Sequence, residues 1–222
     1  MTRLTRTICA AAILAAAASS TRAESPKELS ERFSGPKVAI INVDADAGIQ
    51  AGARKDANKG RSGILEVKHY DDSPKWGWVW QRVFVRFRLD GLKPGDIGSV
   101  HLCIYGNLGD GRRPVDVDIM PLADKDESWK ETGVTWNNAP KPESDVPAGK
   151  LTFDYGNTPT RRTEGRWYIS GDLSAVIKAK LARGAKTVSF LLTTKIREEA
   201  CLFTKEHPDG RKRSPRLAVV RK

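Results

Sequence analysis

The run Ser128-Trp129-Lys130-Glu131-Thr132-Gly133-Val134-Thr135-Trp136-Asn137-Asn138-Ala139-Pro140 places two of the chain's six tryptophans within thirteen residues. Ser128 and Glu131 have the spacing of a capping box, which predicts one tight turn. Residues 134–136 favour a short extended segment. Residues 137–140 then end it, because asparagine tolerates left-handed backbone and proline cannot donate to a strand ladder. The run therefore predicts a bent loop pinned by aromatic side chains.

Trp129 and Trp136 leave two interpretations open. Each tryptophan has a large apolar area and one N–H group that needs a partner. Both could fill the core beneath the loop, or one of them could be exposed as a platform for a sugar ring. The run resembles no nucleophile, metal-ligand or phosphate-binding pattern, so we expect its role to be structural.

Short strand patterns surround this loop on both sides. They alternate apolar and polar residues or stay apolar for a few residues, and turns rich in Gly, Pro and Asp separate them, as at residues 92–96 and 107–111. Many short strands with such turns predict an all-β fold, a jelly-roll-type β-sandwich. The predicted strands span residues 38–43, 64–70, 82–89, 100–105, 115–120, 151–155, 167–170, 188–193, 202–204 and 217–220.

One short helix interrupts this pattern. Asp172 could cap it and Gly184 could end it. We expect this helix to close one end of the sandwich, because its apolar residues fall on one face. They are Leu173, Val176, Ile177 and Leu181.

Residues 1–23 have the pattern of a secretory signal peptide. Arg3 and Arg6 precede an alanine-rich apolar stretch over residues 8–18, and residues 21–23 offer a small-x-small cleavage site. We therefore expect a cleaved signal and a secreted protein, periplasmic or extracellular, with a retained N-terminal anchor as the alternative. No later segment approaches 18 consecutive apolar residues, so we expect no membrane span.

The remaining chain divides into a polar tether over residues 24–37 and a single domain over residues 38–222. The whole chain has 222 residues and a formal charge of +11. Loss of the signal's three arginines would leave 35 basic against 27 acidic residues, a net charge near +8. Such an excess favours acidic polymers as partners, or it only keeps the protein soluble. We expect a monomer.

Two cysteines, Cys103 and Cys201, follow the predicted signal. In an oxidising compartment they could form a disulfide, or they could remain two separate buried thiols. Their spacing fits no zinc site. We expect no metal or cofactor, with a structural calcium ion as the alternative. Hard oxygen donors for calcium occur without a calcium-loop spacing at Asp44, Asp46, Asp56 and Asn58.

A series of further motifs runs through the predicted domain. It comprises Val43-Asp44-Ala45-Asp46-Ala47-Gly48, Asp56-Ala57-Asn58-Lys59-Gly60, Leu65-Glu66-Val67-Lys68, residues 82–89, residues 100–105, Trp167, Asp172-Leu173-Ser174, Phe203-Thr204-Lys205-Glu206 and Ser214-Pro215-Arg216-Leu217. With the loop at residues 129–140, which is the most specific of them, these motifs resemble the DNRLRE-type domain, also grouped as carbohydrate-binding module family 96. The resemblance covers residues 38–221. The chain departs from it at Arg88, where an acid is usual, and at Thr204, where serine is usual.

The resemblance implies a β-sandwich module of the kind attached to exported polysaccharide-degrading enzymes, with alginate-like polyuronates as ligands. It implies ligand contacts from Lys68, Lys205 and Glu206. It also implies that the loop closes one end of the sandwich. The structural residues of the loop would then be Trp129, Glu131, Trp136, Asn137 and Pro140.

The strand at 82–89 offers a further candidate surface. Alternation places Arg82, Phe84, Arg86 and Arg88 on one face of this strand. Guanidinium groups bind carboxylates in bidentate fashion, and an aromatic ring can cover the apolar side of a pyranose. We therefore predict Arg82, Phe84 and Arg86 as ligand residues, and a solvated face with cross-strand charge pairs is the alternative.

Three further tryptophans, Trp76, Trp78 and Trp80, alternate at the spacing of a strand. They could form an exposed aromatic stripe that marks a binding patch, or they could cover the edge of the sandwich.

These observations favour a non-catalytic module that binds an acidic, uronate-type polysaccharide. A lyase or hydrolase acting on uronates is one alternative, although His69, Tyr70, His101 and Tyr105 form no recognisable catalytic pair. A structural protein of the cell surface or matrix is another. Export and the absence of a known motif argue against nucleic acid as a partner.

Overall fold

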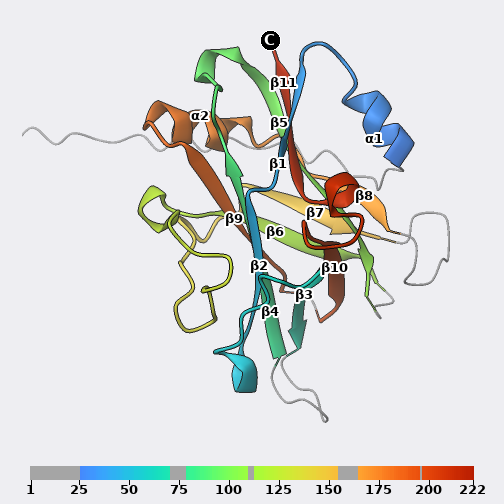
Figure 1. Ribbon diagram of the computed structural model, residues 1–222, viewed down its shortest axis with the longest axis vertical. Helices are drawn as coiled ribbons and strands as arrows, with labels where there is room; N and C mark the ends of the chain where they lie inside the picture. Colours follow the sequence, from blue (N-terminus) through green and yellow to red (C-terminus); the bar gives the residue numbers. More distant parts are fainter. Residues whose placement is uncertain (1–25, 71–78, 110–112, 155–164, 196) are drawn as a thin grey trace, which may run out of the picture.

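The computed structural model describes residues 26–70, 79–109, 113–154, 165–195 and 197–222 (Figure 1). The predicted signal peptide, Trp76 and Trp78 lie outside the described residues, so the predictions made for them stay predictions.

Eleven strands within the described residues join into one sheet (Figure 1). Each of the ten predicted strands overlaps one of them, and β2 corresponds to the motif at residues 43–48. The strands are β1 (Val38–Asn42), β2 (Ala45–Gln50), β3 (Ile64–Tyr70), β4 (Val79–Arg88), β5 (Ile97–Leu108), β6 (Val115–Pro121), β7 (Gly149–Phe153), β8 (Arg166–Ile169), β9 (Thr187–Thr193), β10 (Glu199–Phe203) and β11 (Arg216–Arg221).

The sheet curves back on itself around an apolar core. Its hydrogen-bonded order is β1-β11-β5-β10-β3-β4-β9-β6-β7, with β2 paired to β4 and β8 paired to β5. Val85 of β4 and Phe190 of β9 belong to the same buried cluster as Leu102 of β5 and Leu217 of β11. The two halves of the sheet therefore enclose one main core, and the predicted all-β sandwich is confirmed.

The predicted helix is α2 (Ser174–Ala182). At its start, Asp172 Oδ1 accepts hydrogen bonds from the backbone N–H groups of Ser174 and Val100, at 2.8 and 2.9 Å. Beyond its end, Gly184 has a φ of +80°, the left-handed conformation that stops a helix and favours glycine. Ile177 is buried in the main core, so α2 covers that core as the apolar pattern predicts.

Two further short helices were not predicted, α1 (Pro26–Arg32) and α3 (Gly210–Arg213). The first falls in the segment that we expected to be a polar tether. Leu29 of α1 is buried in a cluster with Tyr105 and Trp167, and Phe33 packs against the same cluster. A polar composition concealed two apolar residues four positions apart, which is the spacing that places them on one side of a helix. The chain also forms three short 3-10 turns, η1 (Gly52–Arg54), η2 (Pro94–Asp96) and η3 (Asp124–Asp126).

None of the helices in the described part of the chain is both long enough and apolar enough to span a membrane.

A second apolar cluster lies on the other face of the sheet. Neighbouring strand residues point to opposite faces, so Val83 and Val85 face the main core whereas Phe84 faces away from it. We call this second group the outer cluster. It consists of Ala45, Ala47, Ile49, Phe84, Met120, Leu122, Trp129, Val134 and Leu191.

The connection between β6 and β7 covers the outer cluster. We call residues 122–142 the covering loop, which is drawn in yellow-green in Figure 1. An isolated bridge between Leu122 and Pro142 holds its two ends together. Trp129 and Val134 of the loop are buried in the outer cluster. The tryptophan-rich run therefore lies across one face of the sheet, where we had expected it to close one end of the sandwich.

Candidate functional site

The motif at residues 56–60 docks the covering loop. The Asn58 side-chain amide donates hydrogen bonds to the backbone oxygens of Glu131 and Val134, at 2.8 and 2.6 Å. The Asn137 amide donates to the Asp56 carboxylate. A Cβ atom at Gly60 would collide with the backbone oxygen of Glu131, so only glycine allows this close approach. These contacts explain why the motif and the loop occur together in one sequence.

The two tryptophans of the covering loop differ in burial: Trp129 fills the outer cluster as a buried plug, and Trp136 is only partly buried. The Trp129 side chain is 8 % exposed, and its ring packs against Phe84 with 5.6 Å between centroids. Its indole N–H donates to Ser189 Oγ at 2.9 Å. Trp136 is half-buried at the rim of the outer cluster. The core interpretation is therefore correct for Trp129, whereas Trp136 keeps part of its ring accessible.

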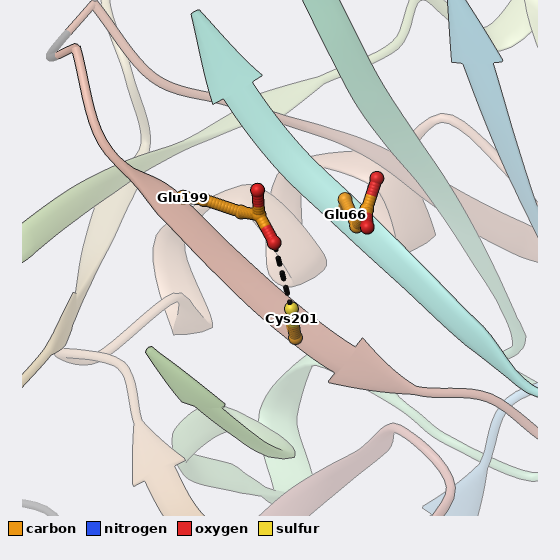
Figure 2. Close-up of side chains that lie close together, drawn as sticks. All are labelled: Glu66, Glu199 and Cys201. Carbon is orange, nitrogen blue, oxygen red and sulfur yellow. Dashed lines mark hydrogen bonds between the residues drawn. The ribbon is translucent and has the colours of Figure 1, made fainter. Parts of the chain in front are cut away.

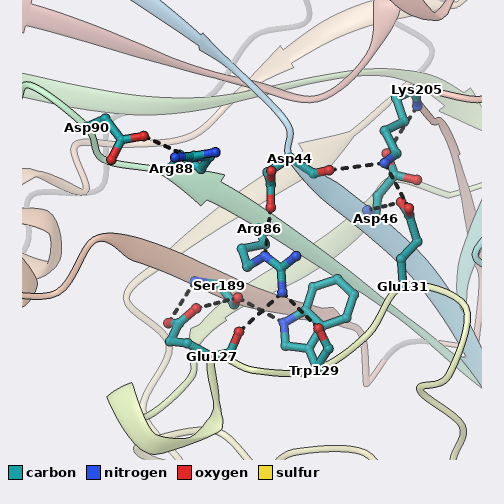
Figure 3. A network of polar contacts seen from close by, with 10 residues as sticks. All are labelled: Asp44, Asp46, Arg86, Arg88, Asp90, Glu127, Trp129, Glu131, Ser189 and Lys205. Atoms are coloured by element: carbon teal, nitrogen blue, oxygen red, sulfur yellow. Dashed lines mark hydrogen bonds and ion pairs between the residues drawn. The ribbon is translucent and has the colours of Figure 1, made fainter.

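Arg86 fastens the covering loop to the sheet (Figure 3). Its Nε donates to Asp44 Oδ2 at 2.9 Å, and its Nη1 donates to the backbone oxygen of Trp129 at 2.8 Å and of Glu127 at 3.2 Å. The guanidinium also lies over the Trp129 ring, 5.0 Å from its centroid. These contacts use the donors on Nε and Nη1 within the protein, so Arg86 supports the fold in this structure.

Phe84 does not take the position that we predicted for it. Its side chain has no exposed area, because the covering loop lies over it. A ring that is sealed beneath Trp129 cannot cover a sugar. The prediction of Phe84 as a ligand platform is therefore wrong: alternation correctly put it on the outer face, but that face is itself a core.

A shallow pocket of about 280 Å³ lies beside Arg86. Its charges balance, because it is lined by three cationic and three acidic side chains, among which Arg88 and Asp90 form an ion pair at 2.8 Å. The pocket therefore gives no net attraction to a polyanion. Its lining residues are Asp44, Arg86, Arg88, Asp90, Glu127, Lys186 and Thr187.

Lys68 is neutralised by neighbouring acids. Its Nζ lies 2.9 Å from Glu66 Oε2 and 3.4 Å from Glu199 Oε2. Burial alone would lower the pKa of Lys68, but these two carboxylates hold it above its usual value. The resemblance placed Lys68 at a ligand, whereas the structure gives it an internal ion-pair network between β3 and β10.

Lys205 and Glu206 lie close to residues of β2, and Figure 3 shows Lys205 with Asp44, Asp46 and Glu131. Lys205 Nζ donates to Glu131 Oε2 at 2.8 Å and to the backbone oxygen of Asp44 at 3.0 Å, and it lies 3.7 Å from Glu206 Oε1. Glu131 Oε1 accepts a hydrogen bond from the Asp46 backbone N–H at 2.9 Å. Glu131 thus bridges the covering loop to β2 and Lys205, where the sequence suggested a capping box with Ser128.

Asp46 carries the strongest electrostatic perturbation of this region. Its side chain is 1 % exposed. The pKa of Asp46 is raised to about 8: burial is the largest cause, the hydrogen bond from the Lys205 backbone N–H opposes it, and the nearby Glu206 carboxylate adds to the increase. A carboxyl group in this environment is ionised at neutral pH only when additional positive charge compensates it.

Arg82 differs from the other predicted cations. Its guanidinium carbon lies 4.3 Å from the ring centroid of Trp80 and 4.7 Å from that of Trp136. Its side chain makes no ion pair within the described residues, and its buried Nε has no hydrogen-bond partner there. Burial lowers the pKa of this guanidinium, which nevertheless stays charged. We call Trp80, Arg82 and Trp136 the Arg82 stack.

The Arg82 stack extends over the surface beyond Trp80. The His69 ring is stacked on the Trp80 ring, with centroids 4.5 Å apart and planes inclined by 10°. All four side chains are half-buried. Sequence reasoning identified Arg82 but did not combine it with Trp136 and His69. The alternation of Trp80 and Arg82 was the available signal, whereas the docking of Trp136 depends on how the covering loop folds.

The histidine and tyrosine candidates for catalysis are held by structural contacts. The His101 ring nitrogens lie 2.9 Å from the Ser170 backbone oxygen and 3.2 Å from Ser99 Oγ. Tyr105 is buried, with edge-on ring contacts to Trp167 and Phe203.

The two cysteines are free, so the disulfide alternative is wrong. Cys103 is buried in the cluster beneath α1, with Tyr105 and Trp167. Cys201 instead lies near Glu199, to which its thiol donates a hydrogen bond at 3.3 Å.

The sequence of the chain was compared with models of known protein families, and one family matches most of its length. The model of carbohydrate-binding module family 96 matches residues 37–220, from the residue before β1 to the penultimate residue of β11. A search of curated proteins gave no match. The family match spans the covering loop, the Arg82 stack and the network around Asp46.

Proposed function

The chain belongs to carbohydrate-binding module family 96, and from this premise we propose that it is an exported, non-catalytic module that binds an acidic polysaccharide of the uronate type at the Arg82 stack. The observation that carries the proposal is the half-buried Arg82 guanidinium, which packs against two tryptophan rings without a carboxylate partner in the described residues.

The Arg82 stack suits a sugar that carries a carboxylate. The two ring centroids are only 5.6 Å apart, so the rings lie on adjacent sides of the guanidinium, and an anion would approach from the sides that they leave open. A charge-assisted hydrogen bond to a carboxylate would compensate for the hydration that the cation loses on burial. The accessible parts of Trp80, Trp136 and His69 offer aromatic surface to the apolar faces of neighbouring sugar units. One small surface thus combines the two contacts that a polyuronate requires.

Charge and the N-terminal pattern support the same function. A formal charge of +11 attracts polyanions at long range. The signal-peptide pattern of residues 1–23 supports export, to a compartment where such polysaccharides occur.

The ligand class can be tested by affinity electrophoresis in gels that contain alginate, pectin, chondroitin or a neutral glucan. We expect retardation in the gels with acidic polysaccharides, weakening with salt because exposed charges are screened. We expect none with the neutral glucan. Equal mobility in all gels would refute polysaccharide binding, and retardation by the neutral glucan alone would refute the acidic specificity. Incubation with the acidic polysaccharides, followed by ultraviolet absorbance, tests for catalysis. No increase in absorbance from unsaturated uronate products would support a non-catalytic module, and an increase would show a lyase.

Substitution of Arg82 locates the binding site. We expect Arg82→Ala to weaken binding by roughly 10- to 150-fold, which corresponds to the loss of about 1.5–3 kcal/mol for a charge-assisted hydrogen bond. Arg88→Ala is the matched control, because this substitution removes the same charge from the same face of β4. Arg88 is already paired with Asp90. Thermal unfolding would verify that both variants fold. Equal weakening in both would indicate a general charge effect and exclude the Arg82 stack as the site.

A further inference from the structure

Three carboxylates from separate segments converge beside β2. Asp46 belongs to β2, Glu131 to the covering loop, and Glu206 to the segment after β10. One oxygen from each of them lies within 4.8 Å of the others. We call these residues the acidic cluster; Figure 3 shows Asp46 and Glu131 with the neighbouring Lys205.

Asp46 points to a missing partner in this cluster. Its side chain is almost fully buried, and Oδ1 accepts no hydrogen bond within the described residues, although Oδ2 accepts one from the Lys205 backbone N–H at 3.1 Å. A buried carboxylate oxygen without a donor is costly, and proteins rarely retain one. The same carboxyl group has an oxygen within 4.8 Å of an oxygen of each of two other carboxylates, which makes a cation its natural partner.

The charges of the acidic cluster are only partly balanced. Lys205 Nζ lies 2.8 Å from Glu131 Oε2 and 3.7 Å from Glu206 Oε1. When Asp46 is ionised, three carboxylates and one ammonium group leave two negative charges, which is the charge that one divalent cation neutralises. Because the Glu206 side chain is 26 % exposed, a hydrated ion can reach the cluster from solvent.

From this geometry we propose that Asp46, Glu131 and Glu206 bind a divalent cation, and that the cation is calcium. Calcium accepts oxygen ligands at 2.3–2.6 Å in flexible geometry and completes its shell with water, so oxygens up to about 5 Å apart can share one ion. Magnesium requires shorter distances of about 2.0–2.1 Å and near-ideal octahedral geometry. This donor set differs from the one that the sequence suggested, because Asp56 and Asn58 are used to dock the covering loop.

The ion would connect the covering loop to the sheet. Glu131 lies in the loop that also carries Trp136, and Asp46 lies in β2, which pairs with β4. Calcium would therefore stabilise the loop that completes the Arg82 stack. The cation site itself does not depend on whether the stack binds a polysaccharide.

A second group of similar composition serves as an internal comparison (Figure 2). Glu66, Glu199 and Cys201 also have ligand atoms within 4.8 Å of one another. There Lys68 pairs with both carboxylates, and Lys59 lies 3.9 Å from Glu66, so the charges already balance. Burial, together with the charge of Glu199, raises the pKa of the Cys201 thiol far above its usual value, and a protonated thiol is a poor metal ligand. We infer no cation at this second group.

Isothermal titration of the chelator-treated protein with calcium chloride tests the proposal, with magnesium chloride as a parallel titration. We expect one calcium site per chain with a dissociation constant of about 0.1–1 mM, the range of extracellular calcium modules, and weaker magnesium binding. We expect Asp46→Asn and Glu206→Gln each to weaken calcium binding at least tenfold. The matched control, Glu66→Gln, should leave it unchanged.

Glu206→Gln keeps the test decisive if Asp46→Asn does not fold, because Glu206 is at the exposed end of the cluster. Calcium should also raise the melting temperature of the wild type and of Glu66→Gln, and at the same calcium concentration it should raise that of Glu206→Gln less. The proposal is overturned if calcium does not bind at concentrations tenfold above the expected range, or if Glu206→Gln binds calcium as the wild type does. Neither result would affect the electrophoretic test of polysaccharide binding.

Discussion

Replacing Trp129 by alanine is expected to lower the free energy of unfolding by about 3–5 kcal/mol, the cost of removing a large buried aromatic side chain. Trp129 fills the outer cluster against Phe84, its indole N–H donates to Ser189 Oγ, and the guanidinium of Arg86 lies over its ring. The alanine variant would leave a cavity between the covering loop and β4. For a chain of this size, thermal denaturation should show a melting temperature lowered by roughly 6–20 °C. Chemical denaturation measures the change in the free energy of unfolding directly.

Two further substitutions separate the contributions of the covering loop. Trp129→Phe keeps most of the ring volume and loses one hydrogen bond, so we expect a cost of about 1 kcal/mol. Trp136→Ala should destabilise the fold less than half as much as Trp129→Ala, because Trp136 is only half-buried. It should weaken polysaccharide binding more than Trp129→Phe does. An equal loss of stability in Trp129→Ala and Trp136→Ala would contradict the assignment of Trp129 as the plug.

The second large effect is expected at Lys180 of α2. Its side chain is 0 % exposed, and Nζ lies 2.7 Å from Asp124 Oδ1 and 3.0 Å from Glu127 Oε1 while it donates to the backbone oxygen of Leu122. Lys180→Met keeps the apolar stem but removes the charge, and it leaves the carboxylate of Glu127 largely buried. Breaking one partner of a buried ion pair costs about 3–5 kcal/mol, measured as the change in the free energy of unfolding.

A double-mutant cycle distinguishes the ion pair from simple packing at Lys180. Glu127→Gln removes the carboxylate charge and keeps one oxygen, which can still accept the hydrogen bond that the Ser189 backbone N–H donates to Oε1 at 2.9 Å. The other oxygen, which accepts from Ser189 Oγ at 2.6 Å, is replaced by an amide NH2 group, so the single variant Glu127→Gln measures the cost of that change. In the double variant Lys180→Met/Glu127→Gln we expect recovery of part of the loss, because no unpaired buried charge remains. Strictly additive losses would show that Lys180 acts through packing alone.

Lys180 also shows a limit of reasoning from the sequence. A lysine in the last turn of a short helix has the pattern of a solvated residue, and it complements the helix dipole. Its burial follows from the position of η3, which supplies Asp124 and precedes Glu127. The sequence shows that Lys180 and Glu127 are present and oppositely charged. It does not show that these residues, which are more than fifty positions apart, form an ion pair in the folded protein.

The strand at residues 82–89 illustrates the same limit for the candidate site. Alternation correctly placed Phe84 and the arginines on one face of the strand. Whether that face meets solvent depends on the covering loop, which buries Phe84, accepts hydrogen bonds from Arg86 Nη1 and packs Trp136 against Arg82. Residues on one face of the strand thus have three different roles: Phe84 is a core residue, Arg86 binds the covering loop, and Arg82 is a candidate ligand contact.

Charge alone was a poor guide to the ligand residues. Lys68 and Lys205 were predicted as contacts because they match the family's motifs and are cationic, yet the structure pairs each of them with nearby carboxylates. Of those carboxylates, Glu66 is close to Lys68 along the chain. Glu199 is distant from Lys68, and Glu131 is distant from Lys205. Ion pairs between distant positions form only once strands are in register, so a count of charges cannot reveal them.

The sequence by itself determined the strands, the helix α2 with its limits, and the membership of carbohydrate-binding module family 96, because alternation, turn residues and motifs are local properties of the chain. Only the tertiary structure decided what the tryptophan-rich run does. It lies on a second apolar face, buries Trp129, presents Trp136 to Arg82 and brings Glu131 to Asp46. These contacts depend on the docking of the covering loop over β4, which joins residues more than forty positions apart and which no local pattern specifies.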